Sequence, residues 1–517
     1  MYQYLIDIEK TEEAARRIKE LLEAHREWFY SESGSADAPL LLRSDECDVR
    51  VLHGRLIFFC WGNCGQSNWR IFGWKRTGDN LLLEAGRRTG SVRAVLKLIP
   101  RASASAIAAT VSAARRARCE RLAALASEML PSARVLRVGL SAGPRSGQPG
   151  RYARIQLSAP RALIAVTSIV ADEVRGDVDA FLSSALIWLA RLNERARTRD
   201  EQKLWLVVQA ELAWEVKRRV ALLRDGLRRA ISLYELDQDW EELKPLPQLE
   251  LEELWNEKLP PFPPVRPVTE SEWASRIIAL APAEIDLVRA RRGETLRFQG
   301  LPFARVRRLM NSEQVWFGIE GGRRRLLEED VLDDWTSLIE ELKAHRRADA
   351  SDHRHAFYRA APESWLESLL RRDITRLDPG LRLAPLHAQF RTSHAGSTGT
   401  RSLDLLALRR DGRLVVIELK VSEDREHALQ GADYWRRVEA HRRAGHISRA
   451  QLFGDLLIED APPLVYLVAP LLRFHRAFNM LARAVRPEIE MYRFDLNENW
   501  RSGVRVVRRA RLNQSQG

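Results

Sequence analysis

The stretch RSLDLLALRRDGRLVVIELKVSEDREHALQGADYWRRVEAHRR, residues 401–443, decides how the C-terminal third of the chain folds. LDLLAL and RLVVIELK have the composition of strands, and RRDG between them is a turn signal. We therefore expect a β-hairpin that brings Asp404 opposite the segment from Glu418 to Lys420. Because side chains two positions apart leave the same face of a strand, Glu418 and Lys420 are expected on one face. The hairpin thus gathers three ionisable groups at one end.

Two carboxylates beside a lysine indicate metal-dependent chemistry on phosphate esters. Carboxylates held close together repel each other unless a cation lies between them, and all-oxygen ligands suit Mg²⁺ or Mn²⁺. The metal polarises a phosphate and activates water, while an ammonium group orients that water. Lys420 is the only lysine after Lys343, in a segment that otherwise uses arginine, which favours a role that a guanidinium cannot fill. The alternative is an ordinary hairpin with surface charges, but the apolar VVI before Glu418 indicates a buried strand.

Two helices are expected on either side of the hairpin. Upstream, ESWLESLLRR is amphipathic and carries Glu363 and Glu367 one turn apart. Downstream, HALQGADYWRRVEAHRR places Gln430 and Tyr434 on one helical face. An amide and a phenol can contact a phosphate or a catalytic lysine without competing for the metal. Each helix alone is ordinary structure, but together with the hairpin they indicate a site.

The C-terminal third is also the basic third, which predicts a polyanionic partner. From Ala344 onward, 29 Arg and one Lys face 21 Asp and Glu, a net charge of +9 out of +13 for the whole chain. We expect DNA to bind here with a strong salt dependence. The residues expected to contact phosphates or stack on bases are Trp435, Arg436, Arg437, Arg442 and Arg443.

The order of helix acid, Asp404, ExK and QxxxY resembles the PD-(D/E)xK nuclease superfamily, particularly its RecB-like branch. Residues 366–420 further resemble the nuclease domain of the EndoMS-type mismatch endonucleases, through a LExxL helix, a PGLRL-like turn, a DLLA strand and an IELK strand. This resemblance covers about residues 360–445. It implies a restriction-endonuclease-like domain with a mixed central sheet flanked by helices. It also implies site residues, which are Glu367, Asp404, Glu418, Lys420, Gln430 and Tyr434 for catalysis, and Asp404, Glu418, Glu367 and the carbonyl of Leu419 for the metal.

The function implied is a Mg²⁺-dependent endodeoxyribonuclease (phosphodiester hydrolase) in DNA repair or defence, with Mn²⁺ as the other candidate metal. The alternative is a catalytically inactive protein with a nuclease fold that binds DNA or acts as a scaffold. Because all six motif positions keep the residue types that the family requires, we favour the active enzyme.

The rest of the chain predicts an α/β multidomain protein without a further recognisable site. The expected segments are a β-rich antiparallel domain (1–99), an α/β and helical region (100–256), a proline-rich linker (257–268), a small α/β segment (269–350) and the nuclease domain (351–517). In the middle region, apolar residues recur every three or four positions from Val208 to Tyr234, which predicts a helix. Its opposite face is basic and is interpreted as solvated, with DNA contact as the alternative. This region is also where a second copy or a partner protein would bind.

Composition excludes several classes of protein. The 517 residues are 45% hydrophobic and 30% charged, which is typical of a folded globular protein. Four cysteines do not suit a disulfide-stapled secreted protein, and the pair Cys60 and Cys64 lacks the further ligands of a zinc site. No apolar run is long enough to span a membrane, and the N-terminus does not look like a signal peptide. We therefore expect a cytoplasmic protein that does not bind membranes.

Overall fold

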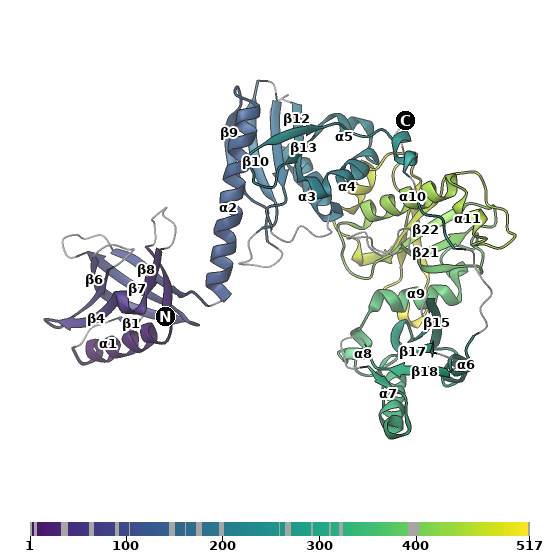
Figure 1. Cartoon of the computed structure of the whole chain (residues 1–517), viewed down its shortest axis with the longest axis horizontal. Helices are drawn as coiled ribbons and strands as arrows, with labels where there is room; N and C mark the ends of the chain where they lie inside the picture. The colour runs from purple at the N-terminus through teal and green to yellow at the C-terminus, as the bar shows by residue number, and fades with distance from the viewer. Residues whose placement is uncertain are drawn as a thin grey trace. The chain divides into compact units, whose positions relative to one another are not determined.

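The computed structural model divides the chain into two compact units (Figure 1). One comprises Met1–Leu157 with Ser168–Asp172, and the other comprises Ser158–Thr167 with Glu173–Gly517. The structure describes residues 3–4, 8–32, 40–61, 67–87, 93–102, 104–143, 150–160, 162–171, 178–195, 201–257, 259–263, 270–290, 293–309, 312–319, 324–390 and 403–514. Much of the proline-rich segment 257–268 and Cys64 lie outside these residues.

The first unit is built on an antiparallel sheet covered by one helix. Helix α1 is Ile8–Glu23, and the strands are β1 (Gln3–Tyr4), β2 (Glu27–Glu32), β3 (Leu40–Arg43), β4 (Cys47–Leu52), β5 (Arg55–Cys60), β6 (Ser67–Thr77), β7 (Asn80–Arg87) and β8 (Arg93–Pro100). The strand order is β3-β2-β8-β7-β6-β5-β4, with β1 on β6. Ile18 of α1 packs with Trp28 and Phe58 in the core. The expected β-rich, antiparallel N-terminal segment is confirmed. Helix α2 (Ala104–Met129) and strands β9 (Arg134–Leu140) and β10 (Ala153–Ala159) follow.

The middle region of the chain alternates strands and helices instead of forming the long helix expected from residue 208 to 234. Its elements in the second unit are β11 (Ala162–Ser168), α3 (Val178–Arg195), β12 (Glu201–Gln209), α4 (Ala210–Ala221), α5 (Asp225–Arg229), β13 (Ile231–Leu236) and β14 (Leu243–Leu246). Val208 belongs to β12 and Tyr234 to β13, two parallel neighbours in the sheet. The prediction of one continuous helix is wrong because short apolar runs of buried strands can imitate a helical spacing.

A small five-stranded antiparallel sheet comes next in the second unit. It consists of β15 (Ile285–Ala290), β16 (Gly293–Phe298), β17 (Leu301–Leu309), β18 (Ser312–Phe317) and β19 (Arg325–Leu326), in chain order. Helices α6 (Glu272–Ile278), α7 (Leu332–His345) and α8 (Ala356–Arg359) accompany it. Ile277 and Leu342 pack with Phe298 and Phe303 in its core. This agrees with the expected small α/β segment.

The C-terminal sheet is mixed and has helices on both faces. Its strands are β20 (His387–Phe390), β21 (Leu403–Leu408), β22 (Leu414–Leu419), β23 (Leu464–Pro470), β24 (Met491–Leu496) and β25 (Val506–Arg511), in chain order. β22, β23 and β24 are parallel and the other pairs are antiparallel. The helices are α9 (Pro362–Arg372), α10 (His427–Arg443), α11 (His446–Arg449) and α12 (Phe478–Ala484). The expected hairpin is present as β21 and β22.

The two faces of this sheet are covered by different helices. On one face, Ile417 packs in a cluster with Trp365 and Leu370 of α9. On the other, Val416 packs in a cluster with Tyr434 and Val438 of α10. The fold is therefore a mixed α/β architecture with several sheets, and the five segment boundaries drawn from the sequence stay predictions. Within the described part of the chain, no helix is long and apolar enough to cross a membrane.

Candidate active site

Asp404 and Glu418 meet where the β21–β22 hairpin ends. Leu405 lies opposite Ile417 in the ladder, so the next pair in the same register is Asp404 and Glu418. One carboxylate oxygen of Asp404, Oδ2, accepts a hydrogen bond of 2.8 Å from the backbone N–H of Leu419. This bond holds the Asp404 side chain across the end of β22, as the sequence predicted.

Lys420 completes the cluster directly after β22. Its backbone N–H donates to the carbonyl of Val468 at 2.9 Å, so the chain still follows the sheet at this point. Its Nζ donates to Glu418 Oε1 at 2.7 Å and lies 3.9 Å from Asp424 Oδ2. The Lys420 side chain is 12% exposed and that of Glu418 only 3%. The two therefore form a nearly buried ion pair on one face of the strand.

The electrostatics of the cluster are those of crowded, buried charges. Burial and the neighbouring Glu418 raise the pKa of Asp404 well above its ordinary value. Burial also raises the pKa of Glu418, although Lys420 acts in the opposite direction. Burial disfavours the charge on Lys420, but Glu418 outweighs it and raises the pKa of the ammonium. The Lys420 ammonium is consequently positive at neutral pH. The positive charge near Asp404 and Glu418 does not offset the cost of burying the two ionised carboxylates.

A divalent cation fits this deficit. Glu418 Oε2 is buried and has no hydrogen-bond partner, an arrangement that costs free energy unless a donor or a cation fills the place. No group of three or more His, Cys, Asp or Glu side chains with metal-binding geometry occurs among the residues that the structure describes. Mg²⁺ does not require one, because it commonly binds through one or two carboxylates and keeps its waters for the rest. The contribution of the Leu419 carbonyl stays a prediction.

The two acidic residues of α9 have different surroundings, because Glu367 forms a buried salt bridge and Glu363 forms none among the residues that the structure describes. Glu367 is 2% exposed and its Oε1 lies 3.1 Å from Arg297 Nη1 of β16, which also binds Asp286. Glu363, one turn earlier, is partly exposed, and its charge acts on both Glu418 and Lys420. The charge of Glu367 acts on Asp404 and contributes to raising its pKa. The role of Glu367 as a metal ligand stays a prediction. Glu363 is a further functional candidate, and its one-turn spacing from Glu367 is the only signal of it in the sequence.

Gln430 and Tyr434 of α10 lie buried on the side of the two acids. Gln430 Nε2 donates to Glu426 Oε2 at 3.3 Å, and its Oε1 is buried with no hydrogen-bond partner. Burial, together with the charges of the two acids at the site, raises the pKa of Tyr434, which places its hydroxyl in their field. Tyr434 therefore stays a neutral phenol at physiological pH. The structure brings Tyr434 to the hairpin acids, and Gln430 lies one helical turn before it on α10, as the spacing predicted.

His427, at the start of α10, was not identified from the sequence. Its Nε2 lies 3.2 Å from the carbonyl oxygen of Glu418, and its ring stacks on Phe474 at a centroid distance of 5.8 Å. Burial and the charge of Lys420 lower the pKa of His427 to about 3, so the ring is neutral and Nε2–H donates to that carbonyl. A single histidine before the QxxxY spacing carries no recognisable signal of this role.

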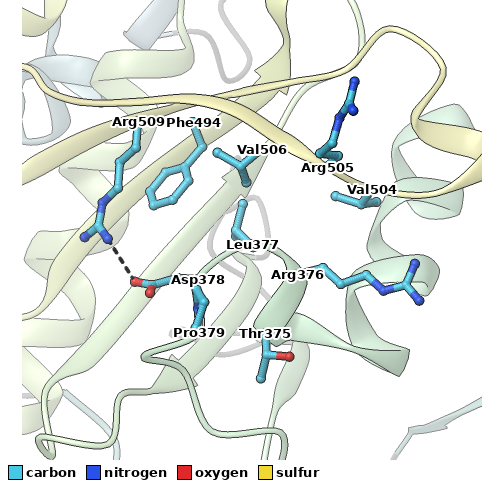
Figure 2. Close-up of a pocket in the computed structure, with 10 residues that line it drawn as sticks. All are labelled: Thr375, Arg376, Leu377, Asp378, Pro379, Phe494, Val504, Arg505, Val506 and Arg509. Atoms are coloured by element: carbon cyan, nitrogen blue, oxygen red, sulfur yellow. Dashed lines mark ion pairs between the residues drawn. The ribbon is translucent and has the colours of Figure 1, made fainter.

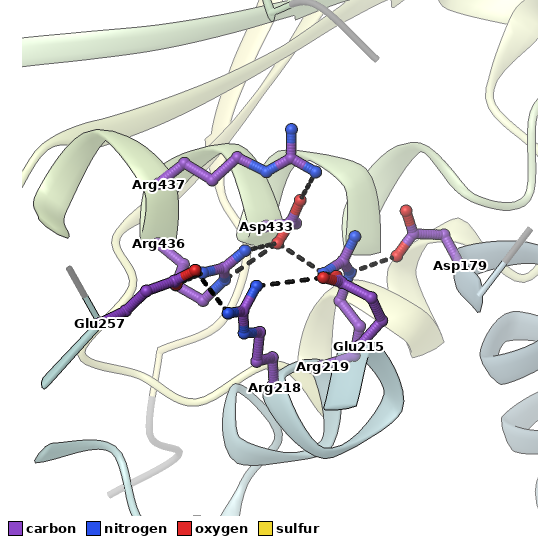
Figure 3. A network of polar contacts seen from close by, with 8 residues as sticks. All are labelled: Asp179, Glu215, Arg218, Arg219, Glu257, Asp433, Arg436 and Arg437. Carbon is purple, nitrogen blue, oxygen red and sulfur yellow. Dashed lines mark hydrogen bonds and ion pairs between the residues drawn. The ribbon is translucent and has the colours of Figure 1, made fainter. Parts of the chain in front are cut away.

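The residues expected to form a DNA-binding surface on α10 are mostly buried, so that prediction is wrong for three of the five. Trp435 is 2% exposed and its indole N–H donates to the carbonyl of Pro463 at 3.0 Å. Arg436 and Arg437 both bind the buried carboxylate of Asp433, at 2.8 and 2.6 Å (Figure 3). None of the three offers a surface to a nucleic acid in this structure, because their charges or rings are used inside the fold.

The last two arginines of α10 are only partly available. Arg442 and Arg443 both bind Glu439, at 2.7 and 2.6 Å, and Arg442 also binds Asp460. The side chain of Arg442 is 11% exposed and that of Arg443 is 49% exposed. Arg443 alone of the predicted set keeps a substantial exposed surface.

The basic face expected on the middle helix is also turned inward. Arg219 of α4 is 7% exposed and binds Asp433 of α10 at 2.7 Å, together with Asp179 at 2.9 Å (Figure 3). Arg218 binds Glu257 at 2.6 Å. The interpretation of this face as solvated is wrong for both arginines, since carboxylates from distant segments cover them. Among the other basic residues between Val208 and Tyr234, Arg228 is buried against Glu250, while Lys217, Arg224 and Arg229 remain partly or fully exposed.

The arrangement as a whole can hold one hard cation and one ammonium next to a phosphate ester. Asp404 and Glu418 would supply the oxygen ligands and Lys420 the ammonium. On α10, Tyr434 would supply a neutral donor and Gln430 an acceptor oxygen. Comparison of the chain with protein-family models, curated proteins and solved structures gives no match in any of the three.

Proposed function

We propose that this protein is a Mg²⁺- or Mn²⁺-dependent nuclease that hydrolyses phosphodiester bonds in DNA. The observation that supports the proposal best is the convergence of Asp404, Glu418 and Lys420 at the end of one hairpin, nearly buried and short of positive charge. Keeping two carboxylates there without a cation costs stability and serves no packing purpose, because the apolar core lies elsewhere along the same strands. Clusters of perturbed acids of this kind mark functional sites more often than structural ones.

Each residue then has a distinct role. Asp404 and Glu418 would hold the cation, which supplies Lewis-acid activation of the phosphate and of water when it is bound. Lys420, as an ammonium, donates a hydrogen bond to the attacking water or to a phosphate oxygen and cannot act as the general base, because its pKa is raised. The neutral hydroxyl of Tyr434 would donate to the phosphate. Gln430, whose buried Oε1 has no hydrogen-bond partner and can only accept, would fix the lysine.

The architecture around the site supports assignment to the PD-(D/E)xK superfamily. The order α9, β20, β21, β22, α10, β23 places a mixed sheet between two helices. This is the kind of core that the sequence resemblance implies, and the acids and lysine lie at one end of its strands β21 and β22. We extend the proposal to a restriction-endonuclease-like domain acting as an endonuclease in DNA repair or defence, within the cytoplasm.

One pair of contacts favours the alternative, a nuclease fold that has lost its activity. Arg297 neutralises the buried Glu367, and Lys420 closes directly onto Glu418. In an inactive scaffold, these ion pairs would replace the cation permanently. The two functions differ in one measurable property, which is cleavage that depends on the acids.

The test is cleavage by the purified full-length protein. Single-stranded, duplex, branched and mismatched DNA, with RNA for comparison, would be incubated with Mg²⁺ or Mn²⁺ and with EDTA. Asp404→Asn should abolish the metal-dependent cleavage, while Glu423→Gln, which changes an exposed carboxylate five residues beyond Glu418, should leave it unchanged. Absence of cleavage of every substrate in both metals would favour the inactive scaffold, and equal cleavage by the two variants would refute the site.

A further inference from the structure

A cavity of about 610 Å³ lies between the segment after α9 and strands β24 and β25 (Figure 2). The carboxylate in its lining, that of Asp378, is paired with Arg509 at 3.5 Å. Arg376 and Arg505 point away from it (Figure 2). The lining residues therefore form an apolar hollow, and nothing in the described part of the chain shows what would cover it.

Two cysteines of the first unit lie directly opposite each other on neighbouring strands. Cys47 is the first residue of β4 and Cys60 is the last residue of β5, and they are partners in the antiparallel ladder. Opposite residues send their side chains to the same face of a sheet, and both of these point into the core, where they are 8% and 1% exposed. Both are thiols in this structure. The sequence spacing draws attention to Cys60 and Cys64, but the ladder makes Cys47 the neighbour of Cys60.

The turn of this hairpin determines which kind of ladder pair the two cysteines form. His53 and Gly54 connect the strands with φ angles of 51° and 70°, as a two-residue type I′ turn requires. Leu52 and Arg55 close that turn as a hydrogen-bonded pair, and the two kinds of pair alternate along an antiparallel ladder. Counted along the register from the turn, the cysteine pair is therefore a non-hydrogen-bonded one, in which the side chains are closer.

A hydrogen bond just outside the pair agrees with this register. The N–H of Trp61 donates to the carbonyl of Glu46 at 2.9 Å, and the ladder bonds beside a non-hydrogen-bonded pair join its flanking residues in this way. The Cα atoms of such a pair are about 4.5 Å apart and the Cβ atoms approach to about 4.5 Å. A disulfide requires about 4.4–6.8 Å between Cα atoms and about 3.5–4.5 Å between Cβ atoms. The backbone therefore already has the spacing that a disulfide between Cys47 and Cys60 needs.

The contacts of the two thiols do not prevent them from meeting. Cys47 Sγ donates to the carbonyl of Ser44 at 3.6 Å, and Cys60 Sγ donates to that of Ser67 at 3.8 Å. Thiols are weak donors, so little stability is lost when the side chains turn toward each other. The pair lies at the open end of the hairpin, and β4 is the outermost strand of its sheet. Local opening of this strand end gives a small oxidant access to Cys47.

We propose that Cys47 and Cys60 form a reversible disulfide when the protein meets hydrogen peroxide. The thiolate of Cys47, the more exposed of the two, attacks one oxygen of the peroxide, which gives a sulfenic acid and releases hydroxide that is protonated to water. The thiolate of Cys60 then attacks the sulfur of the sulfenic acid, so that the S–S bond forms and a second water leaves. Two thiols thus lose two electrons and two protons, and one peroxide becomes two waters. A thiol reductant reverses the reaction by disulfide exchange.

The disulfide would fix an edge strand that pairs on one side only. β4 is bound to the sheet through β5, so a cross-link at the open end of their hairpin restrains the end that opens most readily. In a reducing compartment, such pairs remain thiols and their disulfides are transient and sense oxidants. This site is independent of the nuclease proposal, because it belongs to the first unit and requires no metal.

The experiment maps the disulfides of the full-length protein before and after treatment with hydrogen peroxide. Remaining thiols are blocked with iodoacetamide in urea, so that buried ones react, and the protein is digested with trypsin without reductant for mass spectrometry. Trypsin places Cys47 in the peptide 44–50, whereas Cys60 and Cys64 share the peptide 56–70. Cys64→Ser is therefore the matched control for Cys60→Ser, because Cys64 is the alternative partner on the same peptide.

Peroxide should join the peptides 44–50 and 56–70 at a mass two hydrogens below their sum, and a reductant should separate them again. The cross-link should persist in Cys64→Ser and be lost in Cys60→Ser. Alkylation of both Cys47 and Cys60 in the peroxide-treated wild type would overturn the proposal, a result that does not depend on how any variant folds. A cross-link that disappears in Cys64→Ser, or one that joins two copies of the chain on a non-reducing gel, would overturn it as well.

Discussion

Replacing Lys420 with arginine separates lysine chemistry from mere positive charge. The ammonium sits 2.7 Å from Glu418 Oε1 and 3.9 Å from Asp424 Oδ2, in a side chain that is only 12% exposed. A guanidinium is longer and planar, so it cannot place its donors at the position of Nζ inside this packed space. It keeps the charge and, through its paired N–H groups, can hold the carboxylate of Glu418 at least as well.

The expected cost can be worked from this geometry. If Lys420 orients the attacking water, a shift of that water by about 1 Å lowers the rate on the order of 100-fold. This corresponds to about 2.7 kcal/mol in the activation free energy. Binding of DNA should change by less than about twofold, because the net charge of the cluster is the same. The expected signature is therefore a slow enzyme with normal affinity.

Single-turnover cleavage in Mg²⁺ and binding isotherms in Ca²⁺ would measure the two quantities on the same protein. Lys343→Arg is the matched control, since Lys343 is the preceding lysine in the chain, lies in α7, and is 41% exposed with an ordinary bond to Glu340. Cleavage by Lys420→Arg close to that of the control would refute a water-positioning role. It would reduce Lys420 to a counter-charge for Glu418 and weaken the family assignment.

Three other changes test the acids and the network around α10. Asp404→Asn should abolish cleavage without lowering thermal stability in EDTA. Because the pKa of Asp404 is raised in the folded state, its ionisation destabilises the metal-free wild type as the pH rises from about 4 through that pKa. Thermal denaturation at a series of pH values should therefore show a smaller loss of melting temperature in the variant than in the wild type. Glu363→Gln should slow cleavage about tenfold or more and leave the melting temperature unchanged. Glu367→Gln should mainly lower the melting temperature, because it breaks the salt bridge with Arg297. The opposite result for the two variants would restore Glu367 as the helix acid of the site. Arg219→Ala should lower the free energy of unfolding by about 3–5 kcal/mol in urea denaturation, since it leaves the buried carboxylate of Asp433 short of a partner. Arg229→Ala, at an exposed position, should change it by no more than about 0.5 kcal/mol. Similar values for both variants would contradict a stabilising role of the Arg219–Asp433 contact.

The local parts of the C-terminal fold could be predicted because they depend on neighbours in the sequence. The hairpin follows from two apolar runs around a turn, and Gly412 takes a positive φ of 85° there, as a turn residue can. The pairing of Glu418 with Lys420 follows from the two-residue period of a strand. The facing of Gln430 and Tyr434 follows from the helical period in the same way.

The partners of charged side chains could not be predicted, because they come from distant segments. Arginines are ordinarily solvated, so the sequence predicts a DNA-binding surface at Arg436 and Arg437. Their burial depends on Asp433, whose position on α10 is local, and on Glu257, which lies almost 180 residues earlier. The Arg297–Glu367 pair, which joins strand β16 to helix α9, has the same character. A sequence shows the charge of such groups but not what covers them.

These long-range pairs bear on how the candidate site is assembled. Helix α10 directs Tyr434 toward the hairpin acids, and the preceding residue, Asp433, toward Arg219 of α4. Burial acts to raise the pKa of Asp433, but Arg219 and the arginines of α10 together outweigh it and lower the pKa, so this contact is a charged one at neutral pH. A buried carboxylate that loses one of its guanidinium partners is strongly destabilised. The segment from residue 351 onward contains every proposed catalytic residue but lacks Arg219, so the position of α10 depends on a region that the motif does not include. The proposed nuclease domain therefore extends beyond the stretch that carries the resemblance and includes the helix α4 that binds α10.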